Sequence, residues 1–305
     1  MIKQLLLTYF LFLVVTMTAS KAVAFGVIRT PTPSSPKSLH LFSTSSLSNP
    51  AAAPVDRVVV LEDATAVASR IREITAGAAK QAIAERGYFA LAIPGGSILK
   101  MLAGDDILGD WTLKTTICYV NHKCVEMDDA ELATHAKAMK IFLNKWEGCN
   151  TIIMDGTDKG EEEAKLYEQK MKALDENVLP RNSKGLPVFD LALIGVGDDG
   201  HIGSLYPGRD EVLVGDNGPW VLSVNMKSPP SITLSLPVMA NAKQVVVAAC
   251  GVSDKYPQGK SAGMKRAVVT EDETVQTFPA VGLRRVATWI IDKAAASKLG
   301  DEYNK

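Results

Sequence analysis

The stretch Asp190-Leu-Ala-Leu-Ile-Gly195-Val-Gly197-Asp-Asp199-Gly200-His201-Ile-Gly-Ser204-Leu-Tyr-Pro207-Gly208 decides the fold expected for this chain. Its apolar first part is typical of a buried parallel strand, and the glycines, carboxylates and histidine after it predict a tight polar loop. In open α/β sheets, ligands bind at such strand ends. His201 is one of four histidines in the chain, and the ordinary pKa of histidine suits proton transfer near neutral pH. We therefore expect this loop to form the centre of an active site.

Predicted strands and helices alternate on both sides of this loop. A helix is predicted between Asp63, a capping residue, and Gly87, because apolar residues recur there at three- and four-residue steps. This alternation predicts a single-domain α/β fold, with a mostly parallel sheet and helices on both of its faces. The predicted strands cover residues 58–61, 88–93, 116–120, 151–154, 189–194, 220–224, 244–250 and 286–291.

Polar or glycine-rich segments follow four of the predicted strands. They are Gly95-Gly96-Ser97, Asn121-His122-Lys123, residues 198–201 and Lys255. In a parallel sheet, all four would lie along one edge. A strand followed by Gly-Gly-Ser and a helix can point backbone N–H groups at an anion. With the lysines and the histidine, this edge suits a small phosphorylated substrate and proton transfer that needs no metal.

The charge balance and the motifs that are missing exclude several classes of function. The first 55 residues hold four basic residues and no acidic one, so 29 Lys+Arg remain against 34 Asp+Glu, a net charge of −5. An acidic balance argues against nucleic acid or an anionic membrane as the main partner. No Rossmann GxGxxG opens the first unit, and neither a Walker sequence nor zinc-ligand spacing occurs. We therefore expect no cofactor and no metal, and leave the oligomeric state open, a monomer included.

Two further groups of residues have a structural interpretation. The four cysteines have no CxxC spacing and stand in or beside apolar runs, which predicts buried free thiols, with a regulatory disulfide as the open alternative. The acidic run Glu161 to Glu163 is interpreted as the solvated start of a helix. The cysteines are Cys118, Cys124, Cys149 and Cys250.

The first 55 residues have the composition of targeting segments. Residues 1–24 combine a basic start, an apolar run of about a dozen residues, too short for the roughly 20 that span a bilayer, and the cleavage pattern Ala22-Val-Ala24. Residues 25–55 lack acidic residues and are rich in Ser, Thr, Pro and Ala, which predicts a disordered, transit-like segment. Together they resemble the presequence of plastids that lie inside the secretory system. We expect the plastid stroma as the destination, with secretion as the alternative, and residues 56–305 as the folded domain.

Residues 189–208 carry a specific resemblance to a known family. They resemble the signature of the 6-phosphogluconolactonases: a strand, Gly-x-Gly-x-Asp-Gly-His, then Ser-Leu-aromatic-Pro-Gly. Residues 92–97, 227–237, 278–280 and 289–292 resemble further segments of that family in the same order. The resemblance implies a modified Rossmann-like fold, shared with glucosamine-6-phosphate deaminase. It also implies hydrolysis of a phosphorylated sugar lactone, 6-phospho-glucono-lactone, to 6-phosphogluconate in the oxidative pentose phosphate pathway.

The resemblance implies a role for each residue of the proposed site. His201 would be the general base that activates water, Asp199 would hold its imidazole, and N–H groups of the loop would stabilise the oxyanion. The remaining substrate or phosphate contacts expected are Gly95, Gly96, Ser97, Lys123, Gly197, Gly200, Ser204 and Lys227.

The chain departs from the family pattern around the expected phosphate site. Asn121-His122-Lys123 stands where the family has Asp-Glu-Arg, Thr134-His135 replaces a Ser-Asn pair, and Ser231 replaces an Arg. Two expected guanidinium groups are therefore missing, and Lys123 supplies only a point charge. We expect His122 and His135 to lie at the surface.

Two alternatives to an active lactonase follow. The lost arginines are consistent with a catalytically weakened or altered-substrate relative that still binds a sugar phosphate. An isomerase similar to glucosamine-6-phosphate deaminase is disfavoured, because Ser204-Leu-Tyr-Pro-Gly follows the histidine in place of that family's Ala-Phe-Asn-Glu-Pro.

Overall fold

The computed structural model of the chain describes residues 51–252 and 259–303. The predicted signal peptide, most of the transit-like segment and Lys255 lie outside the described residues. The described residues belong to one compact unit. None of the helices among them is long and apolar enough to cross a membrane.

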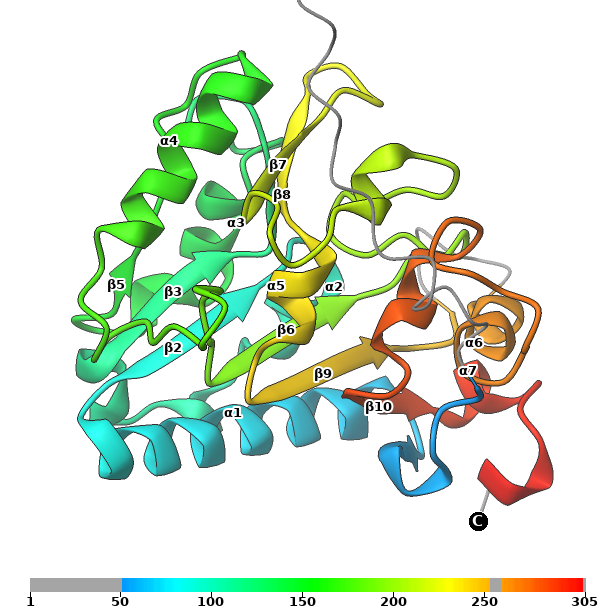
Figure 1. The fold of residues 1–305 in the computed structure, drawn as a ribbon. Helices are drawn as coiled ribbons and strands as arrows, with labels where there is room; N and C mark the ends of the chain where they lie inside the picture. Colours follow the sequence, from blue (N-terminus) through cyan, green and yellow to red (C-terminus); the bar gives the residue numbers. More distant parts are fainter. Residues whose placement is uncertain (1–50, 253–258, 304–305) are drawn as a thin grey trace, which may run out of the picture. The chain divides into compact units, whose positions relative to one another are not determined.

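A parallel sheet forms the centre of the described structure (Figure 1). Its seven described strands follow the order β1-β10-β9-β6-β2-β3-β5, and every neighbouring pair is parallel. This confirms the predicted fold class. The strands are β1 (Val58–Leu61), β2 (Phe89–Ile93), β3 (Thr115–Tyr119), β5 (Asn150–Thr151), β6 (Leu191–Gly195), β9 (Gln244–Ala249) and β10 (Ala287–Asp292).

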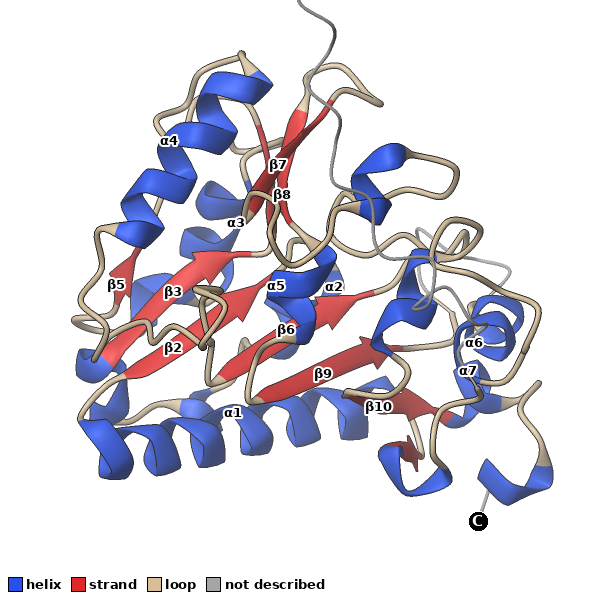
Figure 2. Cartoon of the chain, viewed as in Figure 1, coloured by secondary structure: helices blue, strands red, loops and turns tan. Residues whose placement is uncertain are grey.

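The described helices differ widely in length (Figure 2). The longest, α1, begins where Asp63 Oδ1 accepts the N–H of Ala66 at 2.8 Å, and it ends at Gly87, whose φ is 85°. Both ends agree with the sequence-based prediction, because the cap and the left-handed glycine are local signals. The helices are α1 (Ala64–Arg86), α2 (Ser97–Met101), α3 (Thr134–Ile141), α4 (Gly160–Lys172), α5 (Leu236–Ala240), α6 (Ser261–Val268) and α7 (Lys293–Ala296).

A second, antiparallel sheet of three strands was not predicted. It consists of β4 (Asn121–Lys123), β8 (Ser231–Leu234) and β7 (Val221–Val224), in the order β4-β8-β7. The polar tripeptide of β4 has no apolar alternation, so its sequence predicted a loop at a strand end. Its strand pairing comes from β8, more than a hundred residues later in the chain, and a local pattern cannot reveal such a partner.

Glu163 corrects the interpretation of the acidic run at the start of α4. Its side chain is buried, and its carboxylate accepts the N–H groups of Asp155 and Thr157 at 2.7 Å each. Glu161 and Glu162 are exposed, as expected. The acidic run therefore predicted the start of α4 correctly. The carboxylate of Glu163, however, binds the backbone of the preceding loop and does not face solvent.

The four cysteines are free thiols in the structure. Burial raises the pKa of Cys118, Cys124 and Cys149 to about 12 and that of Cys250 to about 11. Such thiols remain protonated near neutral pH and are poor nucleophiles. The prediction of free thiols is confirmed, although Cys149 and Cys250 are only partly buried.

The strand order creates a switch point between β6 and β2. From β2, the chain continues to β3 and β5 on one side; from β6, it continues to β9 and β10 on the other. The connections after β2 and β6 therefore leave the sheet in opposite directions, and in open α/β sheets ligands bind outside the carboxyl ends of strands at such a point. The Gly-Gly-Ser segment and the His201 loop follow β2 and β6 directly, so the fold brings both segments to this point.

Asp190 joins β6 to β2 at the opposite, amino-terminal edge of the sheet. Its side chain is 3% exposed and accepts the N–H of Ala90 at 2.8 Å. Arg86, the last residue of α1, binds both carboxylate oxygens, and Lys243 Nζ lies 3.3 Å from Oδ1. This buried ion pair fixes the two central strands and the end of α1 together.

We predict that Asp190→Ala lowers the free energy of unfolding by about 3–5 kcal/mol, because it leaves Arg86 without its buried partner. Chemical denaturation of the purified protein measures this change. The control is Glu73→Ala, which removes the exposed Arg70–Glu73 pair and should cost less than about 1 kcal/mol. Equal effects of the two substitutions would contradict the structural role of Asp190.

Candidate active site

The His201 loop contains a histidine–carboxylate pair. His201 Nδ1 lies 2.6 Å from Asp199 Oδ1, which also accepts the backbone N–H of His201 at 3.1 Å. The hydrogen bond from the imidazole is the main cause that lowers the pKa of Asp199 from 3.8 to about 2. Because Asp199 is ionised, Nδ1 must carry the proton and donate it. The lone pair of neutral His201 is then on Nε2, where it can accept a proton from water or a hydroxyl group.

Gly197 allows this pair to fold back against the backbone. A Cβ at Gly197 would collide with the His201 ring and would lie 2.6 Å from Asp199 Oδ1. The N–H of Gly197 donates to the carbonyl oxygen of His201 at 2.9 Å, which closes the loop on itself. The requirement for glycine here is therefore a close approach of side chains and not an unusual backbone angle.

The other side of the loop rests on the segment before β10. A Cβ at Gly200 would collide with the ring of Phe278, and the carbonyl oxygen of Gly200 accepts the N–H of Ala280 at 3.0 Å. Arg266 of α6 stacks over the Phe278 ring, with its guanidinium carbon 4.5 Å from the ring centroid. The loop is thus held by a packed aromatic ring and a backbone hydrogen bond.

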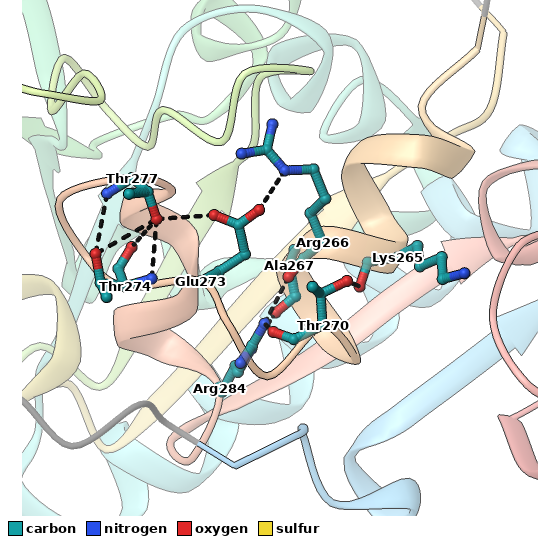
Figure 3. A network of polar contacts seen from close by, with 8 residues as sticks. All are labelled: Lys265, Arg266, Ala267, Thr270, Glu273, Thr274, Thr277 and Arg284. Atoms are coloured by element: carbon teal, nitrogen blue, oxygen red, sulfur yellow. Dashed lines mark hydrogen bonds and ion pairs between the residues drawn. The ribbon is translucent and has the colours of Figure 1, made fainter.

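A polar network ties this supporting segment to α6 (Figure 3). Arg266 donates to Glu273, and Glu273 accepts the hydroxyl of Thr277. Buried Arg284 donates to the carbonyl oxygens of Arg266, Ala267 and Thr270 at the end of the same helix. These bonds fix Phe278 indirectly, because they join the segments on both sides of it to α6.

Ser204 connects the His201 loop to the small sheet. Its N–H donates to Thr233 Oγ1 at 3.1 Å, and its hydroxyl oxygen accepts from Asn121 Nδ2 at 3.1 Å. Alternate residues of a strand share a face, so Lys123 stands on the face of β4 that Asn121 presents to Ser204. Lys123 pairs with Ser231 across the strands β4 and β8. The two positions where the chain lacks the family's arginines are therefore direct neighbours.

Tyr206 and Lys227 lie beside His201. The rings of His201 and Tyr206 have centroids 4.9 Å apart, and Lys227 Nζ lies 4.9 Å from the Tyr206 centroid. Lys227 comes from the turn between β7 and β8 and is exposed. The structure therefore brings this lysine to the site, whereas Lys255 lies outside the described residues.

The Gly-Gly-Ser segment follows β2, the strand next to β6. Gly96 has a φ of 82°, which favours glycine, and Ser97 is the first residue of α2. Gly95 contacts α3, because its Cβ position lies 3.1 Å from Thr134 Oγ1. Ile98 of α2 reaches Gly195 at the end of β6, with 4.0 Å between Ile98 Cδ1 and the Cβ position of Gly195. The helix after the segment thus packs against the end of the strand that leads into the His201 loop.

The expectation of a surface position was wrong for His122, which is buried, whereas His135 is partly exposed. His122 is 1% exposed; its Nδ1 donates to the carbonyl oxygen of Lys123 at 2.6 Å, and its Nε2 accepts the N–H of His135 at 3.1 Å. Burial lowers the pKa of His122 to about 4, so the ring is neutral near pH 7. His135 is partly buried and shares a 2.8 Å hydrogen bond with the hydroxyl of Tyr119.

Lys260 is a residue of the site that the sequence reasoning missed. It is 7% exposed, and its Nζ donates to the carbonyl oxygen of Val196 at 2.8 Å. The sequence reasoning named Lys255, which lies outside the described residues, and did not single out Lys260. The buried residues Gly263, Met264 and Ala267 give the true apolar stripe, and counting back from it would have pointed to Lys260.

No group of three or more His, Cys, Asp or Glu side chains among the described residues is arranged to hold a metal ion. The polar groups in and beside the His201 loop are a histidine–carboxylate pair, lysines and backbone N–H groups. Such a set can bind an anionic substrate and move a proton.

Comparison with known proteins identifies relatives over most of the chain. The family model for glucosamine-6-phosphate isomerases/6-phosphogluconolactonase matches residues 62–290. The "Probable 6-phosphogluconolactonase 4, chloroplastic" of Oryza sativa subsp. indica is 31% identical over 258 residues, which cover 79% of this chain and 76% of that protein. The human 6-phosphogluconolactonase is 31% identical over 238 residues, which cover 72% and 84%.

Solved structures share the fold. The 6-phosphogluconolactonase of Trypanosoma brucei superposes with a TM-score of 0.65 at 18% identity, and the match covers 80% of this chain and 98% of that one. At this identity the match supports the architecture alone.

We predict that His201→Ala raises the pKa of Asp199 from about 2 towards 3.8, because it removes the hydrogen bond that most strongly favours the carboxylate. The carboxyl carbon resonance of Asp199, followed by NMR against pH, measures the change. The lowered pKa also means that the contribution of Asp199 to stability is complete above about pH 4 and is lost as the pH falls towards 2. An unchanged titration in His201→Ala would contradict the pairing.

Proposed function

The chain belongs to the glucosamine-6-phosphate isomerase/6-phosphogluconolactonase family, and on that premise we propose that it hydrolyses 6-phospho-glucono-lactone to 6-phosphogluconate. The observation that carries the proposal is the position of the Asp199-oriented His201 at a switch point, after the strand next to the one that the Gly-Gly-Ser segment follows. The curated relatives quoted above are named 6-phosphogluconolactonases, which supports this activity over the isomerase activity in the family's description.

In the proposed reaction, His201 acts as the general base. Its Nε2 takes a proton from a water molecule while the water oxygen attacks the lactone carbonyl carbon. A tetrahedral oxyanion forms, and backbone N–H groups of the His201 loop stabilise its charge. When the bond from the carbonyl carbon to the ring oxygen breaks, the ring oxygen takes the proton from the imidazolium. Asp199 stabilises the imidazolium between the two steps and keeps the ring oriented.

The phosphate of the substrate would bind at the Gly-Gly-Ser segment. The backbone of Gly95, Gly96 and Ser97 can cradle an anion, and Lys123 and Lys227 bring positive charge from the small sheet. Lys123 contributes a point charge without the planar fork of an arginine, and Ser231 beside it adds none. We expect weaker phosphate binding from this side of the site than two arginines would provide.

We further propose that residues 1–24 are a signal peptide, residues 25–55 a transit-like segment and residues 56–305 the mature enzyme in the plastid stroma. The composition of the two segments motivates this assignment. The rice relative is described as chloroplastic, which agrees with the proposed destination.

We predict that the purified protein accelerates lactone hydrolysis above the spontaneous rate and that His201→Ala lowers kcat by about 10²–10⁴-fold, the usual contribution of a general base. Asp199→Asn should also lower kcat, because the imidazole loses its charged partner. Release of acid from the lactone, followed at constant pH and corrected for the buffer rate, measures this.

Asp198→Asn is the matched control for Asp199→Asn. It removes the same charge from the adjacent position, but the carboxylate of Asp198 accepts only the N–H of Asp199 and does not contact His201. We expect Asp198→Asn to keep most of the activity. A wild-type protein no faster than buffer would rule out the lactonase assignment, and deamination of glucosamine 6-phosphate by the same preparation would favour the isomerase instead.

We predict that residues 1–55 fused to a fluorescent protein direct it to plastids in an algal cell whose plastids lie within the secretory system, and that residues 1–24 alone direct it to secretion. Microscopy with a plastid marker distinguishes the two destinations. Secretion of both fusions would agree with the assignment of a signal peptide but would refute the transit function of residues 25–55.

A further inference from the structure

Thr134 lies directly against the Gly-Gly-Ser segment. It is the first residue of α3, and its side-chain oxygen is the atom nearest to the Cβ position of Gly95, at 3.1 Å. The methyl carbon Cγ2 is farther away, at 3.5 Å, so the hydroxyl and not the methyl group faces the segment. A glycine at position 95 is what permits this approach.

Thr134 is a buried residue, and its hydroxyl lacks a protein partner. Thr134 is 8% exposed, and no residue in the ranges 51–252 and 259–303 forms a hydrogen bond with its Oγ1. Other buried threonines in the chain are satisfied: Thr75 donates to the carbonyl oxygen of Ile71 at 2.7 Å, and Thr115 to that of Trp111 at 2.9 Å. The Oγ1 atom of Thr134 is not fully enclosed, so it remains accessible to a ligand or to water.

The surroundings of this hydroxyl favour an anionic ligand. The first turn of α3 (residues 134–137) contains no Asp or Glu, so no side chain of that turn neutralises the positive end of the helix dipole. The N–H of His135 is instead bound by His122 Nε2. Because burial keeps His122 neutral, this contact satisfies the helix end without placing a negative charge beside the Gly-Gly-Ser segment.

We propose that Thr134 is a phosphate ligand, whose hydroxyl donates a hydrogen bond to the phosphate held by Gly95, Gly96 and Ser97. The phosphate would then lie between the N-terminus of α3 and the segment after β2, with Thr134 on one side and backbone N–H groups on the other. This assignment deepens the proposed function and rests on it for the identity of the phosphate ester. It adds a contact beside the small sheet, whose Lys123 and Ser231 stand where the family has arginines.

The test compares Thr134→Val, which keeps the shape and removes the hydroxyl, with Thr134→Ser, which keeps the hydroxyl. Calorimetric titration with 6-phosphogluconate should show Kd raised about tenfold or more in Thr134→Val and less than about threefold in Thr134→Ser, the loss of one hydrogen bond to a charged group. Gluconate, which lacks the phosphate, should bind all variants equally. In turnover, Thr134→Val should raise KM more than it lowers kcat.

Thr75→Val is the matched control, because it removes a buried threonine hydroxyl from α1 and should leave Kd for 6-phosphogluconate unchanged. Should Thr134→Val fail to fold, Thr134→Ala compared with Thr134→Ser isolates the same hydroxyl. Wild-type affinity in the variant without the hydroxyl would overturn the proposal, and so would an equal loss of gluconate binding or no phosphate-dependent binding by the wild type. Phosphate binding that depends on Thr134, in a protein without lactonase activity, would support this inference and refute the proposed function alone.

Discussion

The parallel pairing of β2 with β6 is the constraint on which the site depends. The chain continues from these two strands towards opposite sides of the sheet, so the segments that follow them lie next to each other at the carboxyl ends of the pair. The Gly-Gly-Ser segment follows one strand and the His201 loop the other. Asp190 fixes the same pair of strands at their other ends, through Arg86 and the N–H of Ala90. The contacts of Asp190 and the candidate site thus lie at opposite ends of the same two strands.

The His201 loop is held rigidly on several sides. Gly197 lets the histidine–carboxylate pair lie on the backbone, Phe278 packs under Gly200, and Ser204 binds the small sheet. The network of Arg266, Glu273 and Arg284 secures the segment that carries Phe278. A general base acts efficiently only when its orientation is fixed, so these contacts support the proposed chemistry.

The departures from the family pattern are concentrated in one region, and the changes in charge that they cause partly cancel. Lys123 and Ser231, which replace two arginines, are neighbours across β4 and β8. In the same segment, Asn121 and neutral His122 replace an aspartate and a glutamate, so negative charge has been removed together with the guanidinium groups. Lys123 therefore leaves the segment Asn121–Lys123 with a net positive charge. Asn121 binds the hydroxyl of Ser204, and His122 binds the N-terminal end of α3.

The sequence by itself determined the parallel α/β class, the ends of α1 and the pairing of His201 with Asp199. These features depend on local signals: buried apolar runs, a cap, a left-handed glycine and two residues two positions apart. The tertiary structure alone decided that Asn121 to Lys123 form a strand, that Glu163 and His122 are buried, and that Lys260 reaches the His201 loop. Each of these depends on a partner distant in the chain, such as β8 for β4 or Val196 for Lys260. A polar side chain has the same local pattern whether it faces solvent or caps a buried backbone group, so only the packed fold distinguishes the two.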